Sequence, residues 1–106
     1  MKEEVVFSVG GRILTAKIKC EIDHHTTRRM RDKIDEELYS NKPEILALDF
    51  SEVHFMDSSG LGLILGRVEK CTALGASVRL VGLSDTLYKL IRLSGIEKVK
   101  NLTVSR

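Results

Sequence analysis

Long hydrophobic runs are missing from this sequence. No apolar stretch approaches the roughly 20 residues that a membrane-spanning helix requires. The first eleven residues, MKEEVVFSVGG, also lack the features of a signal peptide, because their apolar part is short and follows acidic residues. These absences predict a cytoplasmic protein that makes no contact with a membrane.

Neither sign of charge dominates the composition. Lysine and arginine together number 17, aspartate and glutamate number 15, and the formal net charge is +2. A balance this close offers no electrostatic argument for binding a polyanion. We therefore expect no direct contact with nucleic acid.

Cysteine and histidine are also scarce. The two cysteines, Cys20 and Cys71, form no C-x-x-C pair, and two lone cysteines without a secretory segment fit a reducing compartment. The adjacent pair His24 and His25 has no third ligand at a metal-binding spacing. The sequence thus predicts neither a disulfide nor a metal or other cofactor.

What the chain does contain is a regular succession of strand and helix patterns over 106 residues, which is enough for one domain spanning 1–106. Two short alternating runs flank Gly10 and Gly11 and predict a β-hairpin with a two-residue turn. Asp23 then precedes a helical pattern that extends to about residue 40, so it is a candidate N-cap.

The rest of the chain alternates in the same way. EILALDF (44–50) is apolar on both faces, so we expect a central strand covered on both sides. Strands are also expected over 77–82 and, more weakly, 98–104, and a third helix from Ser84 to Gly95. The second helix should end at Gly75, and its expected buried face consists of Leu61, Ile64, Leu65, Val68 and Cys71. This order predicts an α/β fold with a mixed, mostly parallel sheet of about five strands and three helices.

Two polar segments should meet at one edge of this sheet. Asp23 follows one predicted parallel strand, and the loop of Asp57, Ser58 and Ser59 follows the next. Carboxyl ends of parallel strands emerge on the same rim, where open α/β sheets bind their ligands and partners. If these two strands are neighbours, Asp23 and Ser58 belong to one surface.

The residues of this loop allow several chemistries. A hydrolase elbow requires glycine two residues before the nucleophile, whereas Asp57 occupies that position before Ser59, and the histidines do not follow the usual triad order. Gly60, Gly62 and Gly66 miss the dinucleotide-binding spacing by one residue. The backbone N–H groups at the start of a helix can still hold an anion, so nucleotide contact stays open.

The two adjacent serines leave two interpretations open. In the simpler one, the Asp-Ser-Ser segment only caps the helix that follows. In the other, one residue caps and another is free to be modified or to bind a partner. Ser59 lies nearest the predicted helix, so we expect Ser59 to be the cap and Ser58 to be exposed.

Two motifs make the sequence recognisable. EIDHHT (21–26) and FMDSSGLGLILGR (55–67) resemble segments of the STAS family, and within it of the bacterial anti-sigma-factor antagonists. The resemblance covers nearly the whole chain. Cys20 departs from the glycine usual in the family, and relatives usually continue beyond the position of Arg106 into a last helix, whose presence here the sequence leaves open.

The resemblance implies a partner-switching regulator rather than an enzyme. The unphosphorylated antagonist would bind an anti-sigma factor that is also a serine kinase, and so release the sigma factor. Phosphorylation of Ser58 would end that binding, and a serine phosphatase would reverse it. The resemblance places Asp23, His24, Asp57, Ser58, Ser59, Gly60 and Arg67 at the partner-binding surface.

Three alternatives remain open at this stage. The first is the same switch in another pathway, such as a general stress response. The second is a stand-alone STAS domain that binds a nucleotide or small ligand at the serine loop, which ligand-dependent thermal stabilisation without a partner would indicate. The third, ranked last, is an enzyme that acts through Ser58 or Ser59.

Overall fold

The computed structural model describes residues 4–105. Residues 1–3, part of the amino-terminal stretch interpreted above, and Arg106 lie outside that range. The elements follow the predicted order: β1 (Val5–Gly10), β2 (Ile13–Ile18), α1 (Thr27–Asn41), β3 (Ile45–Asp49), α2 (Ser58–Ala73), β4 (Ser77–Val81), α3 (Asp85–Ser94), the 3-10 helix η1 (Ile96–Lys98) and β5 (Leu102–Val104).

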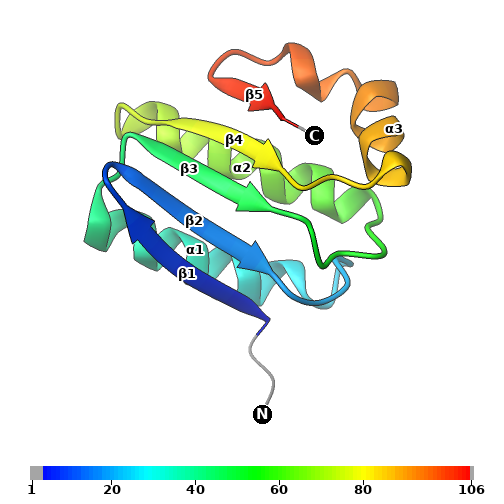
Figure 1. Cartoon of the computed structure of the whole chain (residues 1–106), viewed down its shortest axis with the longest axis horizontal. Helices are drawn as coiled ribbons and strands as arrows, with labels where there is room; N and C mark the ends of the chain where they lie inside the picture. Colours follow the sequence, from blue (N-terminus) through cyan, green and yellow to red (C-terminus); the bar gives the residue numbers. More distant parts are fainter. Residues whose placement is uncertain (1–3, 106) are drawn as a thin grey trace.

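The strands form one five-stranded sheet in the order β1-β2-β3-β4-β5 (Figure 1). β1 and β2 pair antiparallel as a hairpin, and each later neighbour pairs parallel. The predicted α/β class, the mixed sheet and the three helices are therefore confirmed. β2 and β3 are direct neighbours, which is the condition that the predicted polar rim requires.

The hairpin turn lies one residue later than predicted. Gly10 is still paired, with Ile13 opposite, so the two turn residues are Gly11 and Arg12. Gly11 adopts a φ of +61°, a left-handed conformation that glycine tolerates without a steric cost. The Gly-Gly pair indicated the hairpin correctly, but only the second glycine has the conformation that such a turn needs.

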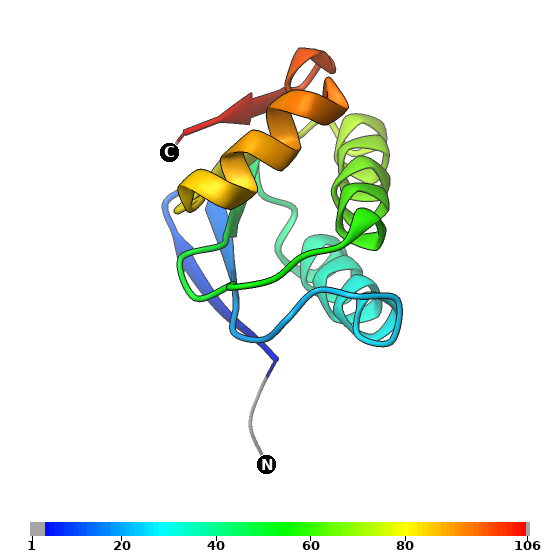
Figure 2. The same cartoon turned by 90° about the vertical axis from the view of Figure 1, so that its right-hand side faces the viewer.

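Both long helices lie on one face of the sheet. Figure 2 shows α1 and α2 side by side on this face, with α3 at one end of the sheet. The alternating side chains of β2 that were predicted to share a face, Leu14, Ala16 and Ile18, are fully buried there. They join Met30, Ile34 and Leu38 of α1 in one apolar core.

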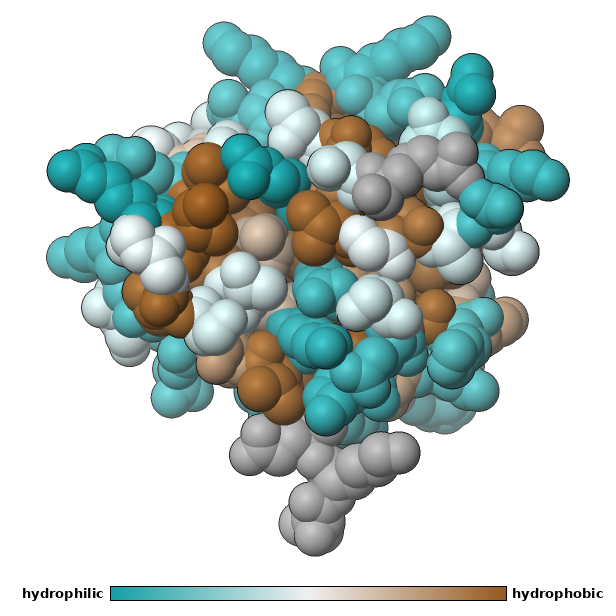
Figure 3. All heavy atoms as spheres, in the orientation of Figure 1, coloured by the Kyte–Doolittle hydropathy of each residue, from teal (hydrophilic) through white to brown (hydrophobic). Residues whose placement is uncertain are grey.

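The apolar sequence of β3 predicted a strand covered on both sides, but helices cover only one of its faces. Leu46 and Leu48 lie in the core beneath the helices, whereas Ala47 lies on the opposite face because side chains alternate along a strand. Ala47 is only 6% exposed because its neighbours in register, Thr15 and Arg79, flank it. On that face, Figure 3 shows apolar patches interrupted by hydrophilic side chains.

The apolar face of α2 also differs from the prediction by a small rotation. Leu63 is buried, whereas Leu65 is 43% exposed. Ile64, Val68 and Cys71 are buried as predicted. None of the helices in residues 4–105 combines the length and apolar character that a bilayer-spanning segment needs.

Candidate functional site

The loops that follow β2 and β3 lie side by side. The N–H of Ile22 donates to the carbonyl of Phe55 at 3.0 Å, and the N–H of Asp57 donates to the carbonyl of Ile22 at 3.0 Å. These bonds form a parallel bridge between Ile22 and Met56 beyond the ends of the strands. Asp23 and Asp57 each follow a bridge residue, so the predicted shared rim is confirmed.

Asp57, not Ser59, caps α2. Its carboxylate accepts a hydrogen bond of 2.8 Å from the N–H of Ser59, and its backbone is extended, with φ −96° and ψ −172°. That conformation is typical of an N-cap residue. The prediction that Ser59 is the cap was wrong, because Ser59 already lies in the first helical turn and its own N–H needs the acceptor.

The two serines have different exposures. Ser58 is the first residue of α2 and is exposed, whereas Ser59 is half-buried. Ser58 was expected just outside the helix, and it lies instead at the first helical position. Its predicted exposure is confirmed, so its hydroxyl is open to a partner or a modifying enzyme.

Asp23 organises the turn before α1. Its carboxylate accepts hydrogen bonds from the N–H groups of His25 at 2.8 Å and Thr26 at 3.1 Å. Because α1 begins only at Thr27, Asp23 caps this turn and not the helix, which corrects the prediction. Partial burial raises the pKa of Asp23, but these two hydrogen bonds, with the nearby imidazoles of His25 and His24, outweigh it and lower the pKa.

His24 lies at the surface next to this carboxylate. It is exposed, and its ring centroid is 3.9 Å from that of His25. Within the described part of the chain, no three His, Cys, Asp or Glu side chains are arranged to hold a metal ion. The contact of His24 with a partner stays a prediction.

Gly60 has an internal reason to be glycine. It is buried, and a Cβ at this position would lie 2.2 Å from Met56 Cγ and 3.3 Å from Ile22 Cγ2. The start of α2 therefore packs directly on the bridge that joins the two loops. A contact of Gly60 with a partner stays a prediction, and its visible role is to hold Ser58 at the rim.

Arg67 joins the two helices from inside. It is only 2% exposed, and its Nε lies 2.8 Å from Oδ1 of Asp35 in α1. Burial lowers the pKa of Arg67, and the Asp35 carboxylate opposes that shift. The ion pair lacks hydrogen-bond geometry, so these two buried atoms have no hydrogen-bond partner among the described residues. Lys70 also lies 3.8 Å from Asp35.

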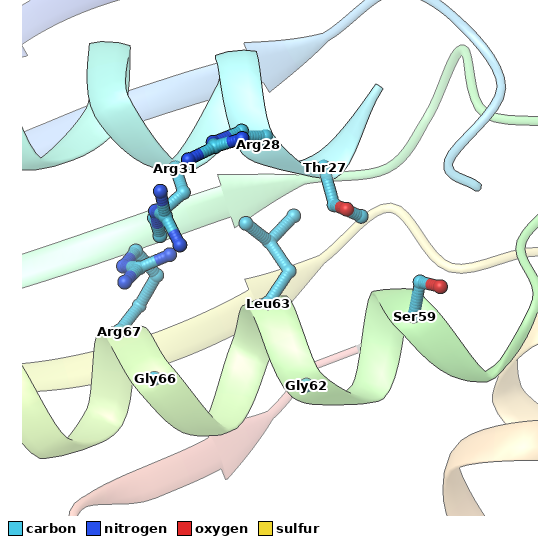
Figure 4. Close-up of a pocket in the computed structure, with 8 residues that line it drawn as sticks. All are labelled: Thr27, Arg28, Arg31, Ser59, Gly62, Leu63, Gly66 and Arg67. Carbon is cyan, nitrogen blue, oxygen red and sulfur yellow. The ribbon is translucent and has the colours of Figure 1, made fainter. Parts of the chain in front are cut away.

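A groove runs between α1 and α2 and reaches the serine loop (Figure 4). Its volume is about 410 Å³. It is lined by Thr27, Arg28, Arg31, Ser59, Gly62, Leu63, Gly66 and Arg67. The sequence interpretation included neither this groove nor Asp35. An arginine on the apolar face of a helix implies a buried acid, but it does not show which acid supplies the charge.

Comparison with known proteins identifies the family. The family model of the STAS domain matches residues 5–105. The anti-sigma F factor antagonist of Paenibacillus polymyxa is 32% identical over 87 residues, which cover 82% of this chain and 74% of that protein. An anti-sigma-B factor antagonist of Listeria monocytogenes is 34% identical over 80 residues, covering 74% and 68% of the two chains.

Solved structures agree with this assignment. The anti-sigma factor antagonist SpoIIAA in its unphosphorylated form superposes with a TM-score of 0.79 and 26% identity, over 96% of this chain and 88% of that one. The Bacillus cell fate determinant SpoIIAA in its phosphorylated form superposes with a TM-score of 0.71 and 26% identity, over 96% of this chain and 91% of that one. The chain is thus similar to both forms.

Proposed function

Because this chain belongs to the STAS domain family, we propose that it is an anti-sigma factor antagonist of a partner-switching pathway, with Ser58 as its phosphorylation site. The unphosphorylated protein binds an anti-sigma factor, which thereby releases its sigma factor. The anti-sigma factor is itself the serine kinase that phosphorylates Ser58, and a serine phosphatase restores the binding form. The protein acts in the cytoplasm as a regulator.

One structural observation carries the assignment of Ser58. Within the Asp-Ser-Ser segment, the carboxylate of Asp57 caps α2 and Ser59 is half-buried, whereas Ser58 is exposed. A kinase must reach the hydroxyl that it modifies, so Ser58 is the better acceptor. Relatives named as anti-sigma factor antagonists support the same function.

Asp23 completes the proposed binding surface. The paired loops bring it to the same rim as Ser58. Its two backbone hydrogen bonds fix the carboxylate in place and favour its charged form. A preorganised carboxylate beside the acceptor serine suits an arginine or lysine of the partner.

Electrostatics can account for release after phosphorylation. A phosphoserine carries about −1.5 to −2 charges at neutral pH, and the start of α2 stabilises it by about 0.3 to 1 kcal/mol. Repulsion from a carboxylate such as Asp57 at ~5 Å costs about 1 kcal/mol per unit charge in water but on the order of 3 kcal/mol at an effective dielectric of ~20, so it increases when binding excludes water. Repulsion within the interface therefore exceeds the stabilisation by the helix.

The pathway is the sporulation type in this proposal, since the relative from Paenibacillus polymyxa named for sigma F matches 87 residues of the chain, whereas the Listeria monocytogenes relative named for sigma B matches 80. The relative named for sigma B gives a second candidate, a stress-response pathway. Binding to purified anti-sigma factors of both types, measured side by side, distinguishes these candidates.

The direct test is incubation of the purified protein with its anti-sigma factor and ATP, followed by mass spectrometry. We expect one phosphate on Ser58, none in Ser58→Ala, and normal phosphorylation in Ser59→Ala. Asp23→Ala should weaken binding by about tenfold or more in calorimetry, as expected when one charged hydrogen bond across an interface is lost. Phosphate on Ser59, or on neither serine, would contradict the proposed switch.

A further inference from the structure

Three arginines converge on the groove between α1 and α2. Arg28 and Arg31 come from α1 and are exposed, and Arg67 comes from α2 and is buried. Figure 4 shows the guanidinium groups of Arg31 and Arg67 next to each other. The charge of Arg31 repels that of Arg67, so an anion bound to Arg31 from the solvent side would be favourable.

Within residues 4–105, a carboxylate neutralises Arg67, but the two exposed arginines that α1 contributes to the groove are less well compensated. Asp35 pairs with Arg67 and also lies near Lys70. The one ion pair of Arg31 within the described residues is with the exposed carboxylate of its neighbour Asp32, at 3.3 Å. Arg28 has no ion pair among residues 4–105. The groove therefore has a positive charge that the fold leaves uncompensated.

Part of the α2 wall of the groove is bare backbone. Gly62 and Gly66 lie one helical turn apart on α2, and a Cβ at either position would meet nothing within 4 Å. Glycine weakens a helix interior relative to alanine, and packing within this chain gives no reason for it here. Gly60 differs, because Met56 fills the space beside it. Two positions without side chains let another molecule approach the helix backbone closely there.

We propose that this groove docks an acidic segment of the anti-sigma factor, whose carboxylates contact the exposed Arg28 and Arg31 while its backbone passes over Gly62 and Gly66. The inference rests on the proposed function and adds a second contact region to the Ser58 rim. Ser59 lines the end of the groove, so the groove and the rim form one continuous surface.

A protein segment fits these observations better than a free anion does. The groove lies between two helices, with its exposed arginines on α1 and its glycines on α2. A single small anion would use the arginines but would not require a bare helix face beside them. An extended acidic segment uses both.

The test measures binding of the purified anti-sigma factor by calorimetry at two salt concentrations. Arg28→Glu combined with Arg31→Glu should weaken binding by about tenfold or more at low salt and reduce its salt dependence. The matched control is Lys33→Glu with Lys98→Glu, which changes the net charge equally at exposed sites outside the groove. We expect that control to bind within about twofold of the unaltered protein.

A second variant tests the bare wall. Gly66→Leu adds a side chain whose Cβ meets no atom within 4 Å, and leucine favours a helix over glycine, so the variant should melt no lower than the unaltered protein but bind the anti-sigma factor about tenfold more weakly. Titration of the isolated protein with inorganic phosphate, followed by amide NMR, tests the alternative of a free anion.

The outcomes separate the two proposals. If the unaltered protein does not bind an anti-sigma factor, the proposed function fails and this inference fails with it. If it binds but the arginine and glycine variants bind equally well, only the groove inference is overturned. Normal binding by the variants together with phosphate shifts at Gly62 and Gly66 would make the groove a site for a small anion instead.

Discussion

At the scale of single residues, the neighbours in the Asp-Ser-Ser segment have different roles. The carboxylate of Asp57 accepts a hydrogen bond from the Ser59 N–H, so the cap does not depend on the hydroxyl of Ser58. A chemical group can be modified reversibly only where the fold does not depend on it. The assignment of the cap to Asp57 is therefore also an argument about Ser58.

Replacing the cap should reduce stability, and replacing its neighbours should not. Asp57→Ala removes the acceptor of the Ser59 N–H, so the free energy of unfolding should fall by about 0.5 to 2 kcal/mol. Ser59→Ala and Ser58→Ala should stay within about 0.5 kcal/mol of the unaltered protein. Urea denaturation of the three variants measures these free energies of unfolding. A loss of stability in Ser59→Ala alone would show that Ser59, and not Asp57, is the cap.

Gly60 and Gly62 form a matched pair for a second stability test. Gly60→Ala places a Cβ against Met56, so we expect a loss of about 1 to 3 kcal/mol from overpacking. Gly62→Ala meets no atom within 4 Å and should gain up to about 1 kcal/mol from helix propensity. Equal effects in the two thermal melts would show that Met56 moves aside easily.

Cys71 gives a prediction about alkaline pH. Burial raises the pKa of its thiol from 9.0 to about 11, although Arg67 opposes the shift. The unfolded chain ionises first as pH rises, so this thiol contributes stability below pH 9 that is lost between about 9 and 11. In a Cys20→Ala background, the stability difference between Cys71 and Cys71→Ala should shrink by about 1 to 2 kcal/mol from pH 8 to pH 10.5. A difference that stays constant would show that the buried thiol ionises as easily as a free one.

At the scale of helices and strands, α1 and α2 are joined by one buried ion pair. Arg67→Ala would leave Asp35 in a largely buried position with only the more distant Lys70, so stability should fall by about 2 to 4 kcal/mol. The double variant Arg67→Met with Asp35→Leu should recover most of that loss, because it removes both charges and fills the space. Denaturation of the single and double variants measures the coupling, and additive losses would show that the pair contributes little.

The elements themselves could be predicted from the sequence because their signals are local. The Ser84 cap and the Gly95 stop of α3 were both confirmed, and each depends on residues within one turn. The alternation of Leu14, Ala16 and Ile18 was enough to place β2. Short-range hydrogen bonding and side-chain periodicity decide such features, and both can be read from neighbouring residues.

What could not be predicted depends on residues far apart in the sequence. The sequence predicted that helices cover the face on which Ala47 lies. Ala47 is instead flanked by Thr15 and Arg79, which belong to the two adjacent strands. Asp35 is 32 positions from the arginine that it neutralises, and nothing in its own helix pattern shows this. The groove likewise arises only when two helices are placed together.

At the scale of the whole molecule, the proposed switch needs no refolding. The chain is similar to both the unphosphorylated and the phosphorylated form of SpoIIAA over 96% of its length. One fold thus accommodates both states of that relative. For this chain, the simplest mechanism is a change of surface charge at Ser58 on an unchanged scaffold.

This mechanism makes a prediction about charge and salt. Ser58→Asp adds one negative charge where phosphate adds nearly two, so it should weaken binding to the anti-sigma factor by about tenfold at low salt. Ser58→Asn has a similar size without the charge and should bind within about threefold of the unaltered protein. Because exposed charges are screened within about 10 Å at 0.1 M salt, the effect of Ser58→Asp should decrease as salt is raised. If Ser58→Asp and Ser58→Asn lost the same binding affinity at every salt concentration, the cause would be steric exclusion. A circular dichroism spectrum that changes on phosphorylation would indicate refolding, and either result would overturn a purely electrostatic switch.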